Sequence, residues 1–326
     1  MKAVRLSRFG GPEVLELVDV PTPALGASEV LVRVQSAGVN FFETLLRADR
    51  YAVTPPLPMI LGVEAVGMVE ALGDGISEPA IGTRVAAPLF ATARPSGGYA
   101  DYVATDAASV VPLPDGLAAE TATALMVQGL TALHLIRQSP PKGKAVLVMA
   151  AAGGVGSLLV QLAKAAGARR VIALASSAEK LGLARDLGAD AGIDYTRPDW
   201  AAQVREATGG AGADIVYDLV GGAVTSASTE ALAACGELLF GALGRFQLHP
   251  AALEAMLSKN QSLKGFALLP LLSQTSLKAD LADLFDRALS GRLRVLRGER
   301  FPLAQVAEAH RALDSRRTTG KVVLIP

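Results

Sequence analysis

The sequence predicts an α/β protein that joins a doubly wound parallel sheet to a second, mostly antiparallel β domain. Three observations support this fold class. An apolar run at residues 145–150 leads into a glycine turn, apolar segments then alternate with helical patterns as far as residue 266, and residues 1–120 form short strands broken by Gly and Pro. A chain of 326 residues is long enough for two domains.

The glycine turn is the most informative motif. Residues 145–150 have the length and the uninterrupted apolar character of a buried parallel strand. Gly153, Gly154 and Gly156 follow, and Leu158, Leu159 and Leu162 then recur at helical spacing. A strand, a glycine turn and a helix N-terminus form a dinucleotide-binding unit, in which backbone N–H groups approach a pyrophosphate. The alternative is a turn that only packs closely.

The end of the next strand indicates which dinucleotide binds. NAD-binding folds carry an acidic residue about twenty residues beyond the turn, for the ribose 2′-hydroxyl. This chain has Ser176 and Ser177 there, followed by Lys180. Hydroxyls and an ammonium group suit a 2′-phosphate, so the sequence predicts NADPH. The same residues could also serve as an ordinary helix N-cap and a solvated lysine, and the two interpretations are compatible.

The remaining elements follow from periodicity. Alternating runs at residues 30–35, 65–70 and 99–104 predict antiparallel strands in the first domain. Residues 118–137 predict a helix. Strands at 145–150, 171–175, 193–194, 214–218, 238–241 and 262–266 predict a six-stranded parallel sheet. Amphipathic helices at 277–289 and 303–315 and a final strand at 321–326 complete the chain.

Composition limits the class of protein. The chain is 51% hydrophobic and 19% charged, with 31 basic and 31 acidic residues, so nothing favours nucleic acid or an anionic membrane as a partner. No secretory segment opens the sequence, and the apolar stretch 263–272 is too short to span a bilayer. Cys235 is the single cysteine. It excludes an intrachain disulfide, fits a reducing cytoplasm and is expected to fill space in the core.

The chain resembles the medium-chain dehydrogenase/reductase superfamily, and within it the zinc-free quinone oxidoreductase branch, which includes zeta-crystallin. The resemblance extends nearly from end to end. Besides the glycine turn, its motifs are residues 1–5 (MKAVR), 9–15 (FGGPEVL), 37–40 (AGVN), 61–67 (LGVEAVG), 82–85 (GTRV), 97–102 (GGYADY), 113–116 (LPDG), 129–131 (GLT) and 319–321 (TGK).

The resemblance implies a GroES-like β domain over residues 1–121, a Rossmann dinucleotide-binding domain over 122–264, and a return to the first domain over 265–326. It also implies a metal-free enzyme. Zinc-dependent relatives bind the metal through a Cys and a His at the positions where this chain has Asn40 and Val63, and neither side chain here is a zinc ligand. His134, His249 and His310 lack ligand spacing and are interpreted as surface or packing residues.

Several site residues are implied by matching positions. In the resemblance, Asn40 and Thr131 line the nicotinamide end of the cofactor, and Asn40 and Tyr51 are the polar candidates for catalysis. The other matching positions are expected to bind the cofactor. They are Gly153, Gly154 and Val155 at the pyrophosphate, Ser176, Ser177, Lys180, Tyr195 and Arg316 around the 2′-phosphate and adenosine ribose, and Phe240, Gly241 and Ala242 as backbone close to the cofactor.

The expected reaction is hydride transfer from NADPH to a quinone or an activated enone, whose oxyanion needs hydrogen-bond donors. Two departures from the family pattern flank the expected substrate site. Asp49 replaces a glycine in the run 47–51 (RADRY), and Leu45 stands where several quinone reductases have Tyr. Alternatives are an enone or enoyl-thioester reductase, or a protein that binds NADPH without turnover. Relatives also suggest a homodimer joined through the edge of the nucleotide domain.

Overall fold

The computed structural model describes residues 1–326, and the chain folds into two compact units. Unit 1 comprises Met1–Leu130 and Leu272–Pro326, and unit 2 comprises Thr131–Leu271. Unit 1 is therefore discontinuous in sequence, because the chain leaves it for the nucleotide-binding sheet and then returns. The resemblance implied domain limits at residues 121 and 264, whereas the compact units divide after Leu130 and Leu271.

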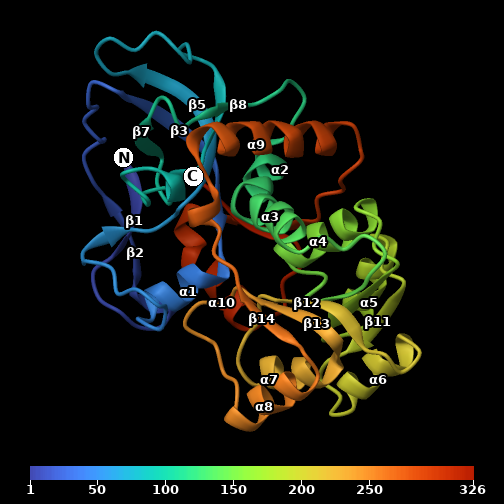
Figure 1. Ribbon diagram of the computed structural model, residues 1–326. Helices are drawn as coiled ribbons and strands as arrows, with labels where there is room; N and C mark the ends of the chain where they lie inside the picture. The colour runs from blue at the N-terminus through green and yellow to red at the C-terminus, as the bar shows by residue number, and fades with distance from the viewer. The chain divides into compact units, whose positions relative to one another are not determined.

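Unit 1 contains two sheets, and the prediction of an antiparallel β domain is confirmed. The smaller sheet has the order β2 (Leu15–Asp19), β1 (Lys2–Leu6), β4 (Met59–Ile60). In the larger sheet all neighbouring strands are antiparallel except the parallel pair β15–β16. Its order is β15 (Arg297–Pro302), β16 (Lys321–Ile325), β3 (Glu29–Val39), β5 (Ala65–Leu72), β6 (Arg84–Ala87) and β8 (Val111–Pro112), with β7 (Tyr102–Asp106) also paired to β3 (Figure 1).

The core of unit 1 explains why the C-terminal segment returns to it. Val30, Val32 and Val34 alternate along β3 and point into a buried cluster. The returning segment adds Leu303, Val306 and Ala309 from η5 (Leu303–Gln305) and α10 (Val306–Asp314), and then Val322 and Leu324 from β16. Without residues beyond 300, this face of the sheet would be exposed to water, so the two sequence segments depend on each other for stability.

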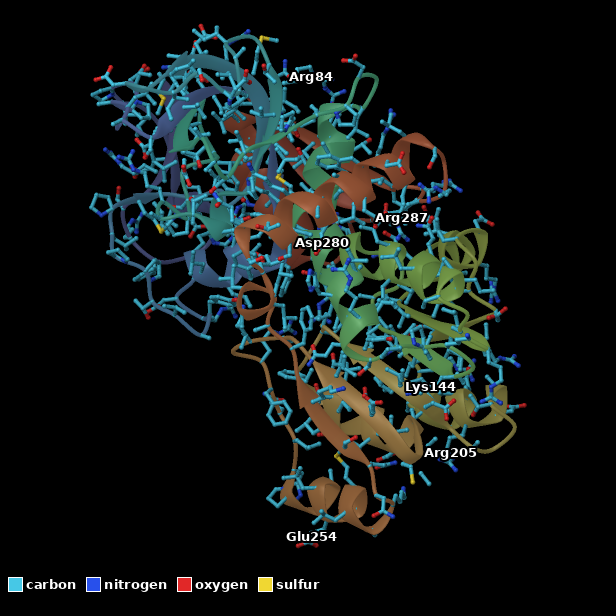
Figure 2. All side chains as sticks on the ribbon, turned by 45° about the horizontal axis from the view of Figure 1, so that its top comes forward. Arg84, Lys144, Arg205, Glu254, Asp280 and Arg287 are labelled. Carbon is cyan, nitrogen blue, oxygen red and sulfur yellow. The ribbon has the colours of Figure 1, made fainter.

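Three further α-helices and three short helical turns belong to unit 1. They are η1 (Pro12–Val14), α1 (Phe41–Arg47), η2 (Leu89–Ala91), α2 (Ala119–Ala124), η3 (Leu125–Gly129) and α9 (Gln274–Leu289). Helix α9 buries Leu277, Leu281 and Leu284, and Arg287, labelled in Figure 2, pairs at 2.9 Å with Asp283 one turn earlier. The predicted helix over 118–137 exists, but its middle turn, η3, is a π-helix. Because α2 contacts β3, β5 and β16, this part of the helix remains with unit 1.

Unit 2 is built around a six-stranded parallel sheet, as predicted. Its strand order is β11 (Ala191–Asp194), β10 (Arg170–Ala175), β9 (Ala145–Val148), β12 (Ala213–Asp218), β13 (Leu232–Phe240), β14 (Ser262–Gly265). Helices α4 (Gly154–Ala165) and α7 (Ala223–Ala231) lie on opposite faces of the strands (Figure 1). The other elements are α3 (Leu130–Gln138), α5 (Ala178–Asp186), α6 (Trp200–Ala207), α8 (Pro250–Ser258) and η4 (Leu269–Leu271).

Strand β13 differs from the prediction. It begins at Leu232, earlier than expected, and a break in its register with β12 separates the pairs Ala213–Leu232 and Ile215–Glu237. Cys235 lies in this bulge with φ of 58° and is exposed. The expectation that Cys235 fills the core was therefore wrong, because a bulge turns it away from the ladder.

Candidate cofactor and substrate site

The glycine turn joins β9 to α4 at the carboxyl end of the sheet. Gly153 is the N-cap of α4 and has no side chain to satisfy the first N–H groups of the helix. Those groups, on Gly154, Val155 and Gly156, have no acceptor within the helix. A Cβ on Gly156 would lie 2.2 Å from the carbonyl oxygen of Ala150, so only glycine allows the helix to start this close to the strand. The result is an anion site made of backbone donors and a helix dipole.

The glycine turn lies at the point where the order of the strands in the sheet reverses. From β9 the chain moves outward to β10 and β11, whereas β12, β13 and β14 continue on the other side of β9. In such sheets ligands bind beyond the carboxyl ends of the strands at this reversal. The predicted residues Phe240 and Gly241 lie at this edge, since Gly241 N donates to Asp218 O at 3.0 Å. Ala242 follows them and is buried.

The ends of β10 and β11 bring two predicted groups together. Ala175 pairs with Asp194 in the parallel ladder, and Tyr195 N donates to Ala175 O at 3.2 Å. Ser176 and Ser177, which follow Ala175, therefore lie beside Tyr195 at the same edge. Tyr195 is half-buried and packs against the core of unit 2.

The alternative interpretation of Ser177 as a helix cap is confirmed. Its Oγ accepts a hydrogen bond from Lys180 N at 3.3 Å at the start of α5. Lys180 thus lies in the first turn of α5 and is half-buried. Sequence reasoning did not consider Asp194, the carboxylate at the end of β11. The Oδ1 atom of Asp194 accepts hydrogen bonds from the N and the Oγ1 of Thr196, at 2.9 and 2.7 Å. These hydrogen bonds lower the pKa of Asp194.

In unit 1, strand order brings Asn40, Glu64 and Lys321 together. Strands β16, β3 and β5 are neighbours in that order. Lys321 begins β16, Asn40 follows the end of β3, and Glu64 precedes β5, so all three lie at one end of the sheet. All are buried. Lys321 Nζ donates to Asn40 Oδ1 at 2.7 Å and to Glu64 Oε1.

The amide nitrogen of Asn40 is also occupied. Asn40 Nδ2 donates to Glu64 Oε1 at 2.9 Å and to Glu43 Oε2 at 3.2 Å. Both N–H groups and the oxygen of this amide therefore form hydrogen bonds within the protein. Sequence reasoning missed Glu43, Glu64 and Lys321 as part of this site, although Glu64 and Lys321 stand inside family motifs.

Glu43 is the carboxyl of the cluster that forms no ion pair with Lys321. Its Oε2 accepts from Asn40 N at 2.9 Å and its Oε1 from Gly62 N at 3.0 Å. Burial raises the pKa of Glu43 to about 7, against the lowering effects of the Asn40 N–H and the Lys321 charge. Burial, reinforced by the nearby carboxylate of Glu43, raises the pKa of the buried Tyr99.

Tyr51 has a free hydroxyl. Its ring packs against Phe42 with centroids 5.4 Å apart, and the hydroxyl makes no hydrogen bond within the protein. Partial burial raises the pKa of Tyr51, so its hydroxyl remains a donor at neutral pH. Asp49, which replaces the family glycine, has φ of 51°, a conformation that Asp tolerates better than most residues. Leu45, the second departure, is buried.

Arg47 is structural in unit 1. Its guanidinium is buried and donates to Gly10 O at 3.1 Å, to His310 Nδ1 at 3.1 Å and to Asp314 Oδ2 at 3.0 Å. Burial, with the Arg47 charge, lowers the pKa of His310 to about 3. His310 is therefore neutral at physiological pH and ties α1 to α10.

The remaining predicted residues are Thr131 and Arg316. Thr131 is the first residue of unit 2 and is buried in α3. Arg316 lies in unit 1, exposed after the end of α10 with φ of 55°.

No group of three or more His, Cys, Asp and Glu side chains is arranged to hold a metal ion. No helix has the length and apolar character needed to cross a membrane.

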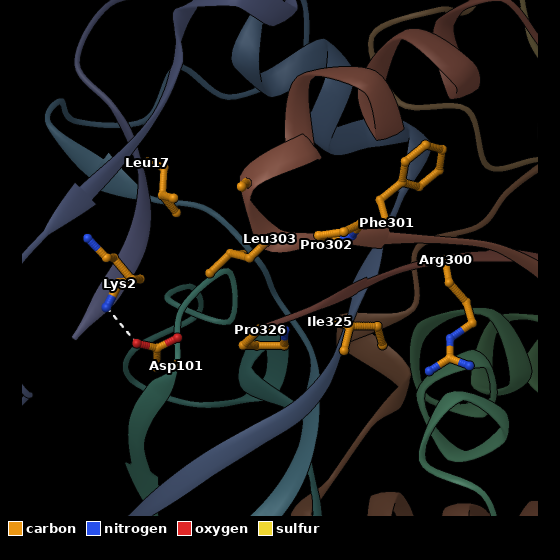
Figure 3. Close-up of a pocket in the computed structure, with 10 residues that line it drawn as sticks. Lys2, Leu17, Asp101, Arg300, Phe301, Pro302, Leu303, Ile325 and Pro326 are labelled. Carbon is orange, nitrogen blue, oxygen red and sulfur yellow. Dashed lines mark hydrogen bonds between the residues drawn. The ribbon is translucent and has the colours of Figure 1, made fainter.

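A pocket in unit 1 is a separate feature. Its volume is about 540 Å³, and Leu17, Phe301, Leu303 and Ile325 supply much of its wall (Figure 3). At one end Lys2 N donates to Asp101 Oδ2 at 2.6 Å. None of the predicted site residues lines this pocket.

Comparison with known proteins agrees with this geometry. A quinone oxidoreductase from Pseudomonas aeruginosa is 38% identical over 332 residues, which cover 100% of this chain and 99% of the relative. The chain belongs to the quinone oxidoreductase branch of the medium-chain dehydrogenase/reductase superfamily. Residues 26–115 match the alcohol dehydrogenase GroES-like domain, and residues 187–324 match the zinc-binding dehydrogenase family.

Two further relatives are informative about chemistry. The crystal structure of Escherichia coli quinone oxidoreductase complexed with NADPH has a TM-score of 0.91 to this chain at 30% identity, with 100% of both chains covered. A 2-haloacrylate reductase from a Burkholderia species is 32% identical, over 99% of this chain and 98% of the relative.

Proposed function

We propose that this protein is an NADPH-dependent oxidoreductase that reduces a quinone or an activated enone without zinc. The observation that carries the proposal is the backbone anion site at the start of α4, where Gly153 leaves the N–H groups uncapped and Gly156 allows close approach. The NADPH complex of the E. coli relative supports the same assignment. When bound, NADPH supplies the hydride.

We infer the cofactor contacts residue by residue. The pyrophosphate would accept hydrogen bonds from the first turn of α4, and the 2′-phosphate would lie near the adjacent ends of β10 and β11. There Ser176 and Ser177 offer hydroxyls and Lys180 offers a positive charge. The full set proposed is Asn40, Thr131, Gly153, Gly154, Val155, Ser176, Ser177, Lys180, Tyr195, Phe240, Gly241, Ala242 and Arg316.

Tyr51 is the proposed donor to the acceptor's oxyanion. Its hydroxyl is free of other protein partners and stays protonated at neutral pH. Asn40 is proposed to border the same site, but its amide hydrogens already bind Glu43 and Glu64. In this arrangement Tyr51 donates the hydrogen bond to the oxyanion, which contributes about 1–3 kcal/mol to stabilising the transition state. Asn40 borders the substrate site without donating to the substrate.

The zinc-free part of the proposal rests on the side chains present. A metal is what lowers the pKa of an alcohol enough to form an alkoxide near pH 7. Asn40 and Val63 stand where zinc-dependent relatives have ligands, and the oxygen of the Asn40 amide already binds Lys321. A quinone or enone needs no such help, because its negative charge delocalises into the conjugated system. We therefore expect conjugated acceptors and not simple alcohols.

An activated alkene is the second candidate acceptor. The 2-haloacrylate reductase relative favours it, since its named substrate is an alkene conjugated to a carboxylate. NADPH oxidation by the purified protein, followed at 340 nm, distinguishes the possibilities. The acceptor panel is 1,4-benzoquinone, 9,10-phenanthrenequinone, a cyclic enone and 2-chloroacrylate, with benzyl alcohol and NADP⁺ tested in reverse. Turnover of benzyl alcohol alone would contradict the proposal, and NADPH binding without any turnover would favour the non-catalytic alternative.

We further propose a cytoplasmic homodimer that joins through β14. This strand is the last in its sheet and pairs only with β13, which leaves one edge open. Leu263 on β14 is an exposed apolar side chain, and so are Leu253 and Leu257 on α8, the helix that precedes β14 in the chain. Sedimentation of the wild type should give a dimer, and Leu257→Glu should weaken it. A monomer at micromolar concentration would contradict the proposal.

A further inference from the structure

The ammonium group of Lys321 is the centre of the buried cluster in unit 1. In the antiparallel ladder Val322 pairs with Val39, so Lys321 and Asn40 are the next residues outward on adjacent strands. The Nζ atom reaches the amide oxygen of Asn40 at 2.7 Å and the carboxylate of Glu64. The side chain of Lys321 is 2% exposed and that of Glu64 is fully buried, so water cannot replace either partner.

The backbone is shaped to admit this pair. A Cβ on Gly38 would lie 2.3 Å from Glu64 Oε1 and 2.6 Å from Lys321 Cε. Glycine at position 38 therefore provides the space through which the lysine reaches the carboxylate. A lysine that only covered surface would need no such opening, which indicates that the contact itself is a built feature.

Glu64 extends the contact to the π-helical turn η3. Its Oε2 accepts a hydrogen bond from Val127 N at 2.8 Å. A π-turn interrupts the regular helical ladder, and an outside acceptor commonly satisfies the donor that it frees. The turn ends at Gly129, two residues before Thr131 in the same continuous helix. Lys321 thus acts on two segments of unit 1, directly on the start of α1 at Asn40 and through Glu64 on η3.

The orientation of the Asn40 amide depends on Lys321. With the oxygen held by an ammonium donor, the nitrogen must face the acceptors Glu43 and Glu64, as observed. Without the ammonium group, the amide oxygen would lose its donor, and the cluster would contain two buried carboxylates and no cation. Either the amide would turn or a carboxylate would take up a proton, and both changes move the start of α1.

We propose that Lys321 is a positioning residue for the reaction, because it holds Asn40 and Glu64, and through them α1 and η3, in the arrangement that accepts the conjugated substrate. This inference rests on the proposed function. Tyr51 belongs to the same arrangement, since its ring packs on Phe42, the second residue of α1.

The test uses the full-length protein and three variants. Lys321→Met removes the charge at similar volume, and Lys321→Met combined with Glu64→Gln removes both charges of the pair. Lys2→Met is the matched control, since Lys2 in the same unit pairs with Asp19 at 2.7 Å but is exposed. Each protein is assayed for Tm, NADPH Kd, and kcat and KM with the best acceptor of the wild type.

We expect Lys321→Met to lower both Tm and kcat, with kcat falling at least tenfold while the NADPH Kd changes less than threefold. The double variant should recover most of the lost Tm, because neither charge of the Lys321–Glu64 pair is left without its partner. It should not recover kcat, because the oxygen of the Asn40 amide no longer has an ammonium donor to hold it. Recovery of kcat together with Tm would overturn the inference and leave Lys321 as a counter-charge only. If Lys321→Met does not fold, the neutral double variant decides the question alone.

Failure of the proposed function gives a different result. If the wild type turns over no acceptor in the panel, the reaction assignment fails whatever the variants do. Positioning is then measured in crystal structures of the wild type and the double variant. An Asn40 amide and α1 start in the same place in both would overturn the inference, and a turned amide would support it.

Discussion

The carbonyl oxygen of Ala150 and the Cα of Gly156 approach so closely that a Cβ on Gly156 would lie 2.2 Å from that oxygen. This contact fixes the distance between the end of β9 and the start of α4. It is therefore the part of the glycine turn that any larger residue would change first.

Gly156→Ala should weaken both stability and cofactor binding. The clash is with backbone, so the turn itself must move, which we expect to cost about 1–3 kcal/mol of unfolding free energy. NADPH affinity should fall at least tenfold, measured by fluorescence titration. Gly182→Ala is the matched control, because its Cβ would meet nothing within 4 Å in α5. That variant should gain up to about 1 kcal/mol. Equal behaviour of the two variants would contradict the role of the contact.

Lys180→Ala should separate the two nicotinamide cofactors. A hydrogen bond to a charged group contributes about 1.5–3 kcal/mol, so NADPH affinity should fall tenfold or more while NADH affinity changes little. Lys164→Ala removes a lysine that pairs with Asp190, and it should leave both affinities unchanged. An equal loss for NADPH and NADH in Lys180→Ala would show that the lysine does not contact the 2′-phosphate.

Glu43 should make stability depend on pH. Its pKa is about 7 in the folded protein and 4.5 when unfolded, so the folded state holds an extra proton between these values. The stability that this carboxyl contributes is present below pH 4.5 and is lost as pH rises through 7. Glu43→Gln cannot lose this proton. Its free energy of unfolding relative to the wild type should therefore rise with pH, by on the order of 3 kcal/mol in total.

Urea unfolding of both proteins from pH 4.5 to 8 measures this difference. His310, with its pKa lowered to about 3, has the opposite sign, since its contribution is lost as pH falls below 6.5. It is present in both proteins and cancels from the difference. Glu254→Gln, on an exposed part of α8, is the control (Figure 2). A pH-independent difference for Glu43→Gln would show that this carboxyl stays ionised in the folded state.

Metal removal should leave the protein unchanged. Neither Asn40 nor Val63 supplies a zinc ligand, and no cluster of ligating side chains exists elsewhere. After exhaustive dialysis against a chelator, we expect the same Tm and the same rate of quinone reduction. Zinc at one equivalent per chain in the purified protein, with activity lost on its removal and restored on its return, would refute the zinc-free proposal.

The nucleotide-binding half of the molecule could be predicted from the sequence. The strand, turn and helix around Gly153 lie within a short window, where apolar runs and helical spacing select the elements. Parallel strands joined by helices wind in one hand, which limits the strand orders that the sheet can adopt. Ser177 could be predicted as a cap for the same local reason, since its partner Lys180 is three residues away.

The polar cluster of unit 1 was decided by tertiary structure. Asn40 and Lys321 are 281 positions apart, and only the order β16, β3, β5 makes them partners. From the sequence, the side chain of Asn40 would be expected to donate a hydrogen bond to the substrate. In the folded protein both its amide nitrogen and its amide oxygen already have partners within unit 1. Asp49 is a second example. Its backbone is left-handed, with φ of 51°, a conformation that glycine adopts freely and that Asp tolerates better than most residues.

The features predicted from the sequence differ from those decided by tertiary structure in the distance along the chain over which their interactions act. Helix periodicity, caps and turns act over a few residues, so the sequence by itself determined the α/β class, the glycine turn and the helix cap at Ser177. A buried charge must find its partner wherever the chain brings one, because water cannot reach it. Tertiary structure alone therefore decided that Lys321 holds Asn40 and Glu64, that burial raises the pKa of Glu43 to about 7, and that Tyr51 keeps a free hydroxyl.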